Sequence, residues 1–199
     1  MRLITSTILA LSAITASAIP TNPTVNTPES TLQTWGVKAF PDGPILNING
    51  TVQDIYAQLT ELNPNYDNED WGSEFDDDTS TLTARASRNN LFCMPETSRS
   101  SMGFLGPVRD GIEYLRKVKG KPQLGAGDCG RVSCSFSTAI HWCNDATKPR
   151  TLPSFNNIAD GAQAIINGCL SGFNPKMGQV GGSLDHFDHW RVVVKRAEC

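Results

Sequence analysis

Charged residues are scarce in this sequence: Lys, Arg, Asp and Glu make up only 19% of its 199 residues. That share lies below the usual quarter and argues against a coiled coil or a solvated polyelectrolyte. The formal net charge is −3, which gives no overall attraction to nucleic acid, so we expect no nucleic-acid partner. Beyond the N-terminus there is no run of 18 apolar residues, and we therefore expect no transmembrane anchor.

Common catalytic and cofactor-binding motifs are also missing. The sequence has no G-x-S-x-G elbow, no H-E-x-x-H pair and no P-loop. The glycine-rich residues 178–182 neither follow a predicted strand nor open a predicted helix, so we interpret them as a flexible loop. We predict no cofactor.

Cysteine is absent from residues 19–92 and occurs six times after them. An even number of cysteines in a secreted chain predicts disulfides, here three bridges with no free thiol. Zinc is the alternative, but zinc sites favour paired C-x-x-C spacing, which is not found here. The cysteines are Cys93, Cys129, Cys134, Cys143, Cys169 and Cys199.

The first 18 residues have the pattern of a secretory signal peptide. Arg2 provides a positive start, Leu3 to Ile14 form an apolar run, and Ala16-Ser17-Ala18 is a small-x-small cleavage site. The run is too short to span a bilayer comfortably, which makes a membrane anchor the weaker alternative. We expect cleavage after Ala18 and a secreted, extracellular protein.

The remaining chain divides into two parts of opposite charge. Residues 19–85 contain two bases and 11 acids, whereas residues 86–199 contain 14 bases and nine acids. Leu82-Thr83-Ala84-Arg85, at the boundary, has the L-x-x-R form at which kexin-like proteases trim fungal pro-proteins. We predict that 19–85 is a partly disordered, removable pro-segment cut after Arg85 or nearby Arg88, and that 86–199 folds without it.

The acidic part contains one predicted helix and one acidic cluster. Thr51 can cap a helix over 51–62, whose apolar stripe must pack somewhere and is the main objection to a removable segment. Residues 67–78 include seven acids but lack the calcium-loop register, so we interpret them as a solvated linker. Asn49-Gly50-Thr51 is a glycosylation sequon.

The cysteine region predicts an α+β fold. Helical stripes cover 107–118 and 155–167, and short strands are expected at 90–93, 131–136, 139–143 and 190–194. The order β-α-β-β-α-β is that of a split βαβ sandwich, with two helices on a four-stranded antiparallel sheet. An irregular disulfide scaffold is the alternative. In the split sheet the first and last strands are neighbours, which favours a Cys93–Cys199 bridge.

Part of this region resembles a known protein group. It is similar to small secreted cysteine-containing proteins of filamentous fungi, which are effector-like and share a helix-on-sheet architecture with fungal killer toxins. The resemblance covers about 90–199 and carries no catalytic motif, so it assigns no functional residue. The segments concerned are Asp128-Cys129-Gly130, Ser133-Cys134-Ser135, Ala139 to Asp145 and Ile158 to Ala162.

Candidate catalytic chemistry centres on the only three histidines, His141, His186 and His189. A polar lead-in to the last strand is the simpler interpretation of 185–190. The alternative makes His186 and His189 metal ligands together with Asp185 or Asp188. A small ribonuclease would need His, Glu and Arg around a phosphate, and the glutamates of this region are poorly placed for that role.

The strongest local charge is the basic patch Arg116, Lys117, Lys119 and Lys121. It could dock on an anionic surface or an acidic partner, or simply be a solvated helix C-terminus, where bases are favoured. The acidic residues 67–78 could mask it.

We expect a monomeric, secreted, non-enzymatic protein, effector-like or toxin-like, which binds an unidentified extracellular protein or anionic surface. The alternative is a secreted hydrolase acting on RNA or a wall polymer through His141 or the His186/His189 pair. Clustered histidines lining a cleft would favour the hydrolase, and scattered histidines the binding protein.

Overall fold

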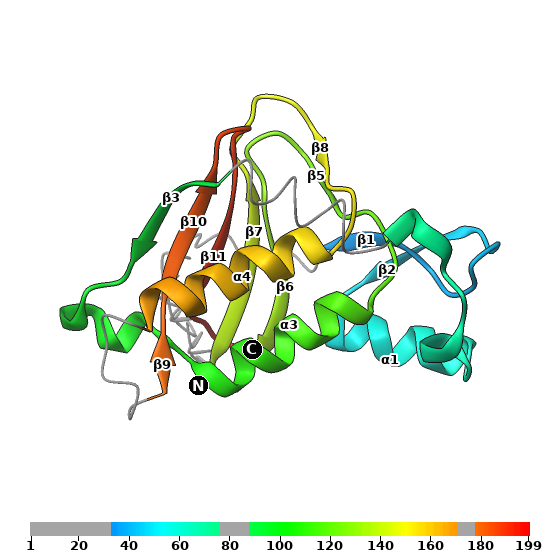
Figure 1. Ribbon diagram of the computed structural model, residues 1–199, viewed down its shortest axis with the longest axis horizontal. Helices are drawn as coiled ribbons and strands as arrows, with labels where there is room; N and C mark the ends of the chain where they lie inside the picture. Colours follow the sequence, from blue (N-terminus) through cyan, green and yellow to red (C-terminus); the bar gives the residue numbers. More distant parts are fainter. Residues whose placement is uncertain (1–32, 76–87, 171–177) are drawn as a thin grey trace, which may run out of the picture.

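The computed structural model describes residues 33–75, 88–170 and 178–199. Its centre is an antiparallel sheet with strand order β3-β10-β11-β7-β6, and two helices cover one face of it (Figure 1). The strands are β3 (Arg88–Cys93), β6 (Cys129–Ser135), β7 (Thr138–Asn144), β10 (Gly182–His186) and β11 (Trp190–Arg196). The covering helices are α3 (Leu105–Lys117) and α4 (Asn156–Cys169).

The predicted α+β class, with helices on an antiparallel sheet, is confirmed, but the sheet has five strands rather than four. The additional strand is β10, which includes part of the supposed flexible loop. Position 182 of this strand requires glycine, because a Cβ there would lie 2.4 Å from the Phe92 carbonyl oxygen and 3.1 Å from Cys169 Sγ. The glycine therefore permits the close approach of neighbouring backbones. From the sequence alone, such a glycine cannot be distinguished from one in a flexible loop.

Small residues let the two helices lie close to the sheet. A Cβ on Gly161 of α4 would lie 2.5 Å from Val192 Cγ2, and one on Gly111 of α3 would lie 2.4 Å from Ser133 Oγ. At the start of α4, the Ser154 backbone N–H donates to Asn157 Oδ1 over 3.1 Å. Among the described residues, no helix is both long and apolar enough to cross a membrane.

The acidic part adds a hairpin and a helix to the same body. They are β1 (Thr34–Lys38), β2 (Ile45–Asn49) and α1 (Val52–Leu62), followed by the 3-10 turns η1 (Tyr66–Asn68) and η2 (Gly72–Phe75). The N-terminus of α1 is capped as expected, because the Asp54 carboxylate accepts from both the backbone N–H and the hydroxyl of Thr51.

This acidic part shares one hydrophobic core with the cysteine region. Trp35 is fully buried, and its ring centroid lies 6.2 Å from that of Trp142 and 5.8 Å from that of Phe155. Its Nε1 donates to the Gly50 carbonyl over 3.0 Å. Val37, Val52, Ile55, Leu59 and Tyr66 belong to the same buried cluster.

Short strand pairs complete the architecture. A 3-10 segment, η3 (Glu96–Ser101), follows β3. The remaining strands pair as β4 (Gly103–Phe104) with β9 (Gln179–Val180), and β5 (Gln123–Leu124) with β8 (Arg150–Thr151). The predicted processing sites, Ala18 and Arg85, lie outside the described residues.

All six cysteines form three disulfides with no free thiol, as predicted, but the proposed Cys93–Cys199 bridge is wrong. Strand β10 lies between β3 and β11, so the first and last strands of the sheet are not neighbours. The bridges are Cys93–Cys169, Cys129–Cys143 and Cys134–Cys199.

Candidate functional site

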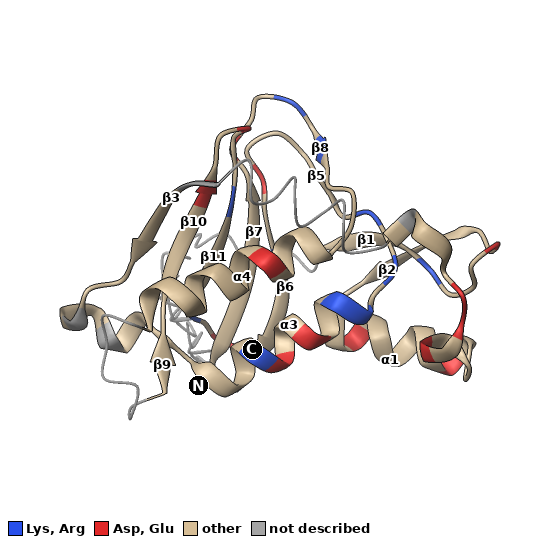
Figure 2. Cartoon of the chain, viewed as in Figure 1, with Lys and Arg blue, Asp and Glu red and all other residues tan. Residues whose placement is uncertain are grey.

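The basic end of α3 and the acidic turns after α1 line one cleft of about 570 Å³, which we call the charged cleft. Three of the four residues of the predicted basic patch contribute to it, while Lys121 lines a second groove together with residues of β1, β2 and β5. Figure 2 shows the basic last turn of α3 on the side of the molecule that carries α1 and its acidic turns. The lining residues are Tyr66, Asp67, Glu69, Asp70, Trp71, Gly72, Ser73, Arg116, Lys117 and Lys119.

A series of edge-to-face aromatic pairs holds the acidic wall of this cleft against α3. The centroid distances are 5.5 Å for Tyr114–Tyr56, 6.1 Å for Tyr56–Tyr66, 5.1 Å for Tyr66–Trp71 and 6.3 Å for Trp71–Phe75. Trp71 Nε1 also donates to the Tyr66 carbonyl over 3.2 Å. Residues 66–75 are therefore a packed element, which corrects the solvated-linker interpretation over 67–75, while residues 76–78 of that stretch lie outside the described residues.

Tyr66 joins the two walls through its hydroxyl group. The hydroxyl donates to the Lys117 carbonyl over 3.3 Å and accepts from the Lys119 N–H over 2.8 Å. Both backbone groups lie where α3 ends and lack helical partners. Burial raises the pKa of this phenol well above its usual value, so it remains a neutral hydrogen-bonding group.

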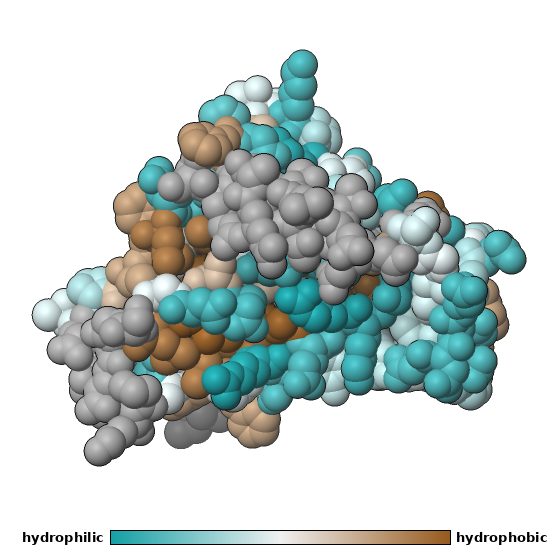
Figure 3. Space-filling view, viewed as in Figure 1, coloured by the Kyte–Doolittle hydropathy of each residue, from teal (hydrophilic) through white to brown (hydrophobic). Residues whose placement is uncertain are grey.

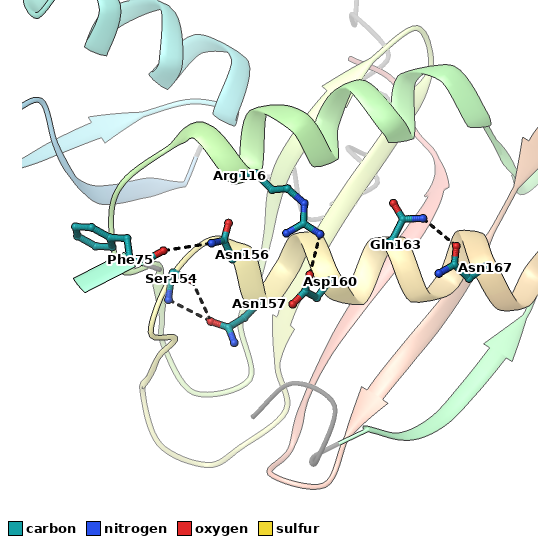
Figure 4. A network of polar contacts seen from close by, with 8 residues as sticks. All are labelled: Phe75, Arg116, Ser154, Asn156, Asn157, Asp160, Gln163 and Asn167. Carbon is teal, nitrogen blue, oxygen red and sulfur yellow. Dashed lines mark hydrogen bonds and ion pairs between the residues drawn. The ribbon is translucent and has the colours of Figure 1, made fainter. Parts of the chain in front are cut away.

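The basic wall is anchored to α4 and to the core. Figure 4 shows Arg116 of α3 pointing at Asp160 of α4, with Nη2 and Oδ1 2.8 Å apart. In the same view the Asn156 side-chain amide reaches the Phe75 carbonyl over 3.4 Å, which ties the start of α4 to the end of the acidic wall. These contacts fix the positions of both walls before any ligand arrives.

The charges of the cleft are mixed rather than uniformly basic. Lys117 Nζ lies 5.0 Å from the Tyr56 ring centroid, and Tyr56 donates a short hydrogen bond to Asp67. That hydrogen bond, with burial, raises the pKa of Tyr56 to about 12. Glu69 accepts from Asn63, and Asp70 accepts from the Gly72 N–H. The described part of the acidic segment thus lies beside the basic patch and leaves an open cleft between them.

The structure does not bring the three histidines together. His186 is buried and stacks on Trp190 with ring centroids 3.5 Å apart, whereas His189 is exposed in the following turn at φ 62°. Asp188 pairs with Arg150 instead of a histidine, over 2.8 Å. In the described ranges, no group of three or more His, Cys, Asp or Glu residues could hold a metal ion.

His141 lies on β7, opposite Arg131 of β6 and Val193 of β11. Burial, together with the positive charges of Lys195 and Arg131, lowers the pKa of His141 to about 4. Its Nδ1 is buried with no hydrogen-bond partner among the described residues. No histidine lines the charged cleft.

Sequence reasoning missed the aromatic side chains that build the cleft. Trp71 and Phe75 stand among acids in the sequence, and solvated acidic linkers have little use for large apolar side chains. That contrast was the available signal.

Asn49, the predicted glycosylation site, is exposed at the end of β2, where its side-chain oxygen accepts a short hydrogen bond from Thr34.

Comparison with known proteins adds no relative from which a role could be transferred. No protein-family model, no curated protein and no solved structure matches this chain.

Proposed function

We propose that this chain is a secreted, disulfide-locked binding protein of the effector or toxin kind, which contacts an extracellular target through the charged cleft. The observation that carries the proposal is the cleft itself, a preformed site with Trp71 and Lys119 on opposite walls. Tryptophan, tyrosine and arginine side chains carry much of the binding energy at protein interfaces, and Trp71 and Arg116 both line the cleft. Three disulfides suit an oxidising, extracellular compartment.

The mixed charge of the cleft favours a protein target over an anionic surface. Asp67, Glu69 and Asp70 would repel a phospholipid or polymer that carries only negative charge. A protein segment with both signs can match both walls, and such complementarity selects partners more than it strengthens binding.

The hydrolase alternative receives less support from the geometry. His141 and Arg131 are neighbours on the sheet, but a histidine with a pKa near 4 is a weak base. Neither His186 nor His189 adjoins the charged cleft. Hydrolysis of RNA or a wall polymer that His141→Ala abolishes would establish the alternative.

A capture experiment with two opposite charge changes tests the proposal. Residues 19–199 are immobilised and exposed to extracellular fluid from a host tissue or competing organism, and retained proteins are identified. We expect Lys119→Glu and Asp70→Lys each to reduce capture of the same protein at least tenfold, whereas Lys148→Glu, outside the cleft, should leave it unchanged.

Binding to vesicles that contain anionic phospholipid tests the alternative target, an anionic surface. If the target were an anionic surface, Asp70→Lys would strengthen vesicle binding while Lys119→Glu weakened it. Capture that neither cleft variant alters would refute the assignment of the cleft.

A further inference from the structure

The two edges of the main sheet differ in how they are covered. At one edge, α1 and the β1–β2 hairpin lie against β6: Gln53 of α1 donates to Ser133 Oγ over 2.7 Å, and a Cβ on Gly130 would lie 2.9 Å from the Trp35 ring. At the other edge, β3 pairs only with β10 within the described part of the chain. Unpaired edges offer their backbone groups to another strand.

The pairing with β10 identifies which backbone groups of β3 point outward. The Met94 N–H donates to the Gly181 carbonyl over 2.9 Å, and the Phe92 carbonyl points at Gly182. Successive residues of a strand direct their backbone groups to opposite sides. The N–H and C=O groups of Leu91 and Cys93 therefore face the open edge.

The second half of this edge strand is apolar, and its one charged residue, Arg88, stands at its first position. Leu91 is 39% exposed and Phe92 56% exposed, and residues 89–93 contain no charged side chain. Figure 3 shows apolar surface on the left of the molecule, where β3, β10 and the end of α4 lie. Edge strands are commonly protected by lysine or proline, and residues 89–93 contain neither.

The strand is also held rigidly in position. The Cys93–Cys169 disulfide ties its end to α4, and Asn90 to Cys93 are in continuous register with β10. A strand that is already ordered loses little conformational freedom when it pairs again.

We propose that β3 is a self-association edge, at which a second copy of this chain adds its own β3 in antiparallel orientation about a two-fold axis at Phe92. Leu91 of each copy then exchanges backbone hydrogen bonds with Cys93 of the other, and the two sheets become one. Phe92 faces its counterpart in a non-hydrogen-bonded pair, where aromatic side chains pack well.

A second copy suits this edge better than a foreign peptide because the edge is self-complementary. A two-fold axis at Phe92 places Arg88 of one copy opposite residue 96 of the other, so the one charge of the strand does not meet its own counterpart. Residues 91 and 93, both facing outward, are equidistant from Phe92. The pairing involves few residues, so association is weak and depends on concentration. This inference does not rest on the charged cleft.

Sedimentation equilibrium of residues 19–199 provides the first test. The average mass should rise toward twice the monomer mass as the concentration increases from micromolar to hundreds of micromolar. Phe92→Lys places two like charges opposite each other, and we expect it to remain monomeric with an unchanged melting temperature. Phe187→Lys is the matched control, because Phe187 is 66% exposed in the β10–β11 turn; it should associate like wild type.

A cross-linking variant tests the register directly. Opposed Cα atoms in such a pair lie about 4.5 Å apart, within the range that a disulfide spans. We expect Phe92→Cys to form a covalent dimer under mild oxidation, and Phe187→Cys to form at least tenfold less. A wild-type chain that stays monomeric throughout, a dimer that persists in Phe92→Lys, or equal cross-linking of the two cysteine variants would overturn the proposal.

Discussion

Trp35 is the side chain of the acidic part that packs against two aromatic rings of the cysteine region. It is fully buried between Trp142 and Phe155, and its Nε1 is satisfied by the Gly50 carbonyl. We expect Trp35→Ala to lower the free energy of unfolding by about 3–5 kcal/mol, because the cavity left behind cannot close fully. Urea denaturation measures the loss.

Ile45→Ala is the control for this substitution, since Ile45 belongs to the same hairpin but is 68% exposed. Its effect should stay within about 0.5 kcal/mol. A Trp35→Ala protein as stable as the Ile45→Ala protein would show that the hairpin contributes little to the core.

His141 should make stability depend on pH. Its folded pKa of about 4 lies below the ordinary histidine value of 6.5, so above pH 6.5 the residue is neutral in both states and carries no penalty. As the pH falls from 6.5 to 4, His141 binds a proton in the unfolded chain but stays mostly neutral in the folded protein. The unfolding free energy should therefore decrease by about 2–3 kcal/mol over that window.

The contribution of His141 can be separated from that of the carboxylates. Denaturation curves of wild type and His141→Gln should differ in slope between pH 6.5 and 4, with the variant less sensitive to acid. An imidazole titration by NMR with a midpoint near the ordinary value would contradict the burial of this residue.

Regular elements with a full apolar stripe were predictable from sequence, whereas elements defined by close contact were not. The stripes at 107–118 and 155–167 correspond to α3 and α4, because burial of one helical face leaves a clear period. Strand β10 begins with Gly182, whose function is visible only beside Phe92 and Cys169. The walls of the charged cleft depend on aromatic pairs between distant elements, which no local pattern records.

The three disulfides should differ in their effect on stability according to the length of chain that each closes. Cys93–Cys169 joins residues 76 apart, whereas Cys129–Cys143 joins residues 14 apart on paired strands. Loop entropy gives about 4.5 kcal/mol for the former and about 3 kcal/mol for the latter.

Alanine pairs allow this comparison. We expect Cys93→Ala/Cys169→Ala to be less stable than Cys129→Ala/Cys143→Ala by about 1–2 kcal/mol in non-reducing urea denaturation. The Cys134–Cys199 bridge, which spans 65 residues, should resemble the longer loop. A larger loss from the short bridge would mean that native strand pairing, and not the unfolded chain, governs the effect.

At the scale of the whole molecule, the shared core changes what processing after Arg85 would do. The sequence favours a removable segment, but Val52, Ile55 and Leu59 of α1 are buried in the cluster that also contains residues of α3 and β7. Removing residues 33–75 would expose a large apolar surface on the cysteine region. The predicted cut therefore remains a proposal, and we expect it to leave the acidic part bound.

Because no cysteine lies in 19–92, a chain cut after Arg85 is held together by non-covalent contacts alone. Intact mass under denaturing conditions should then give two polypeptides, 19–85 and 86–199, whereas native mass spectrometry should give one complex.

Residues 86–199 expressed alone should lose cooperative thermal unfolding and regain it when the 19–85 peptide is added, since the peptide returns Trp35 to Trp142 and Phe155. If 86–199 unfolds cooperatively without the peptide, at the same temperature as the full chain, the acidic part is dispensable to the fold.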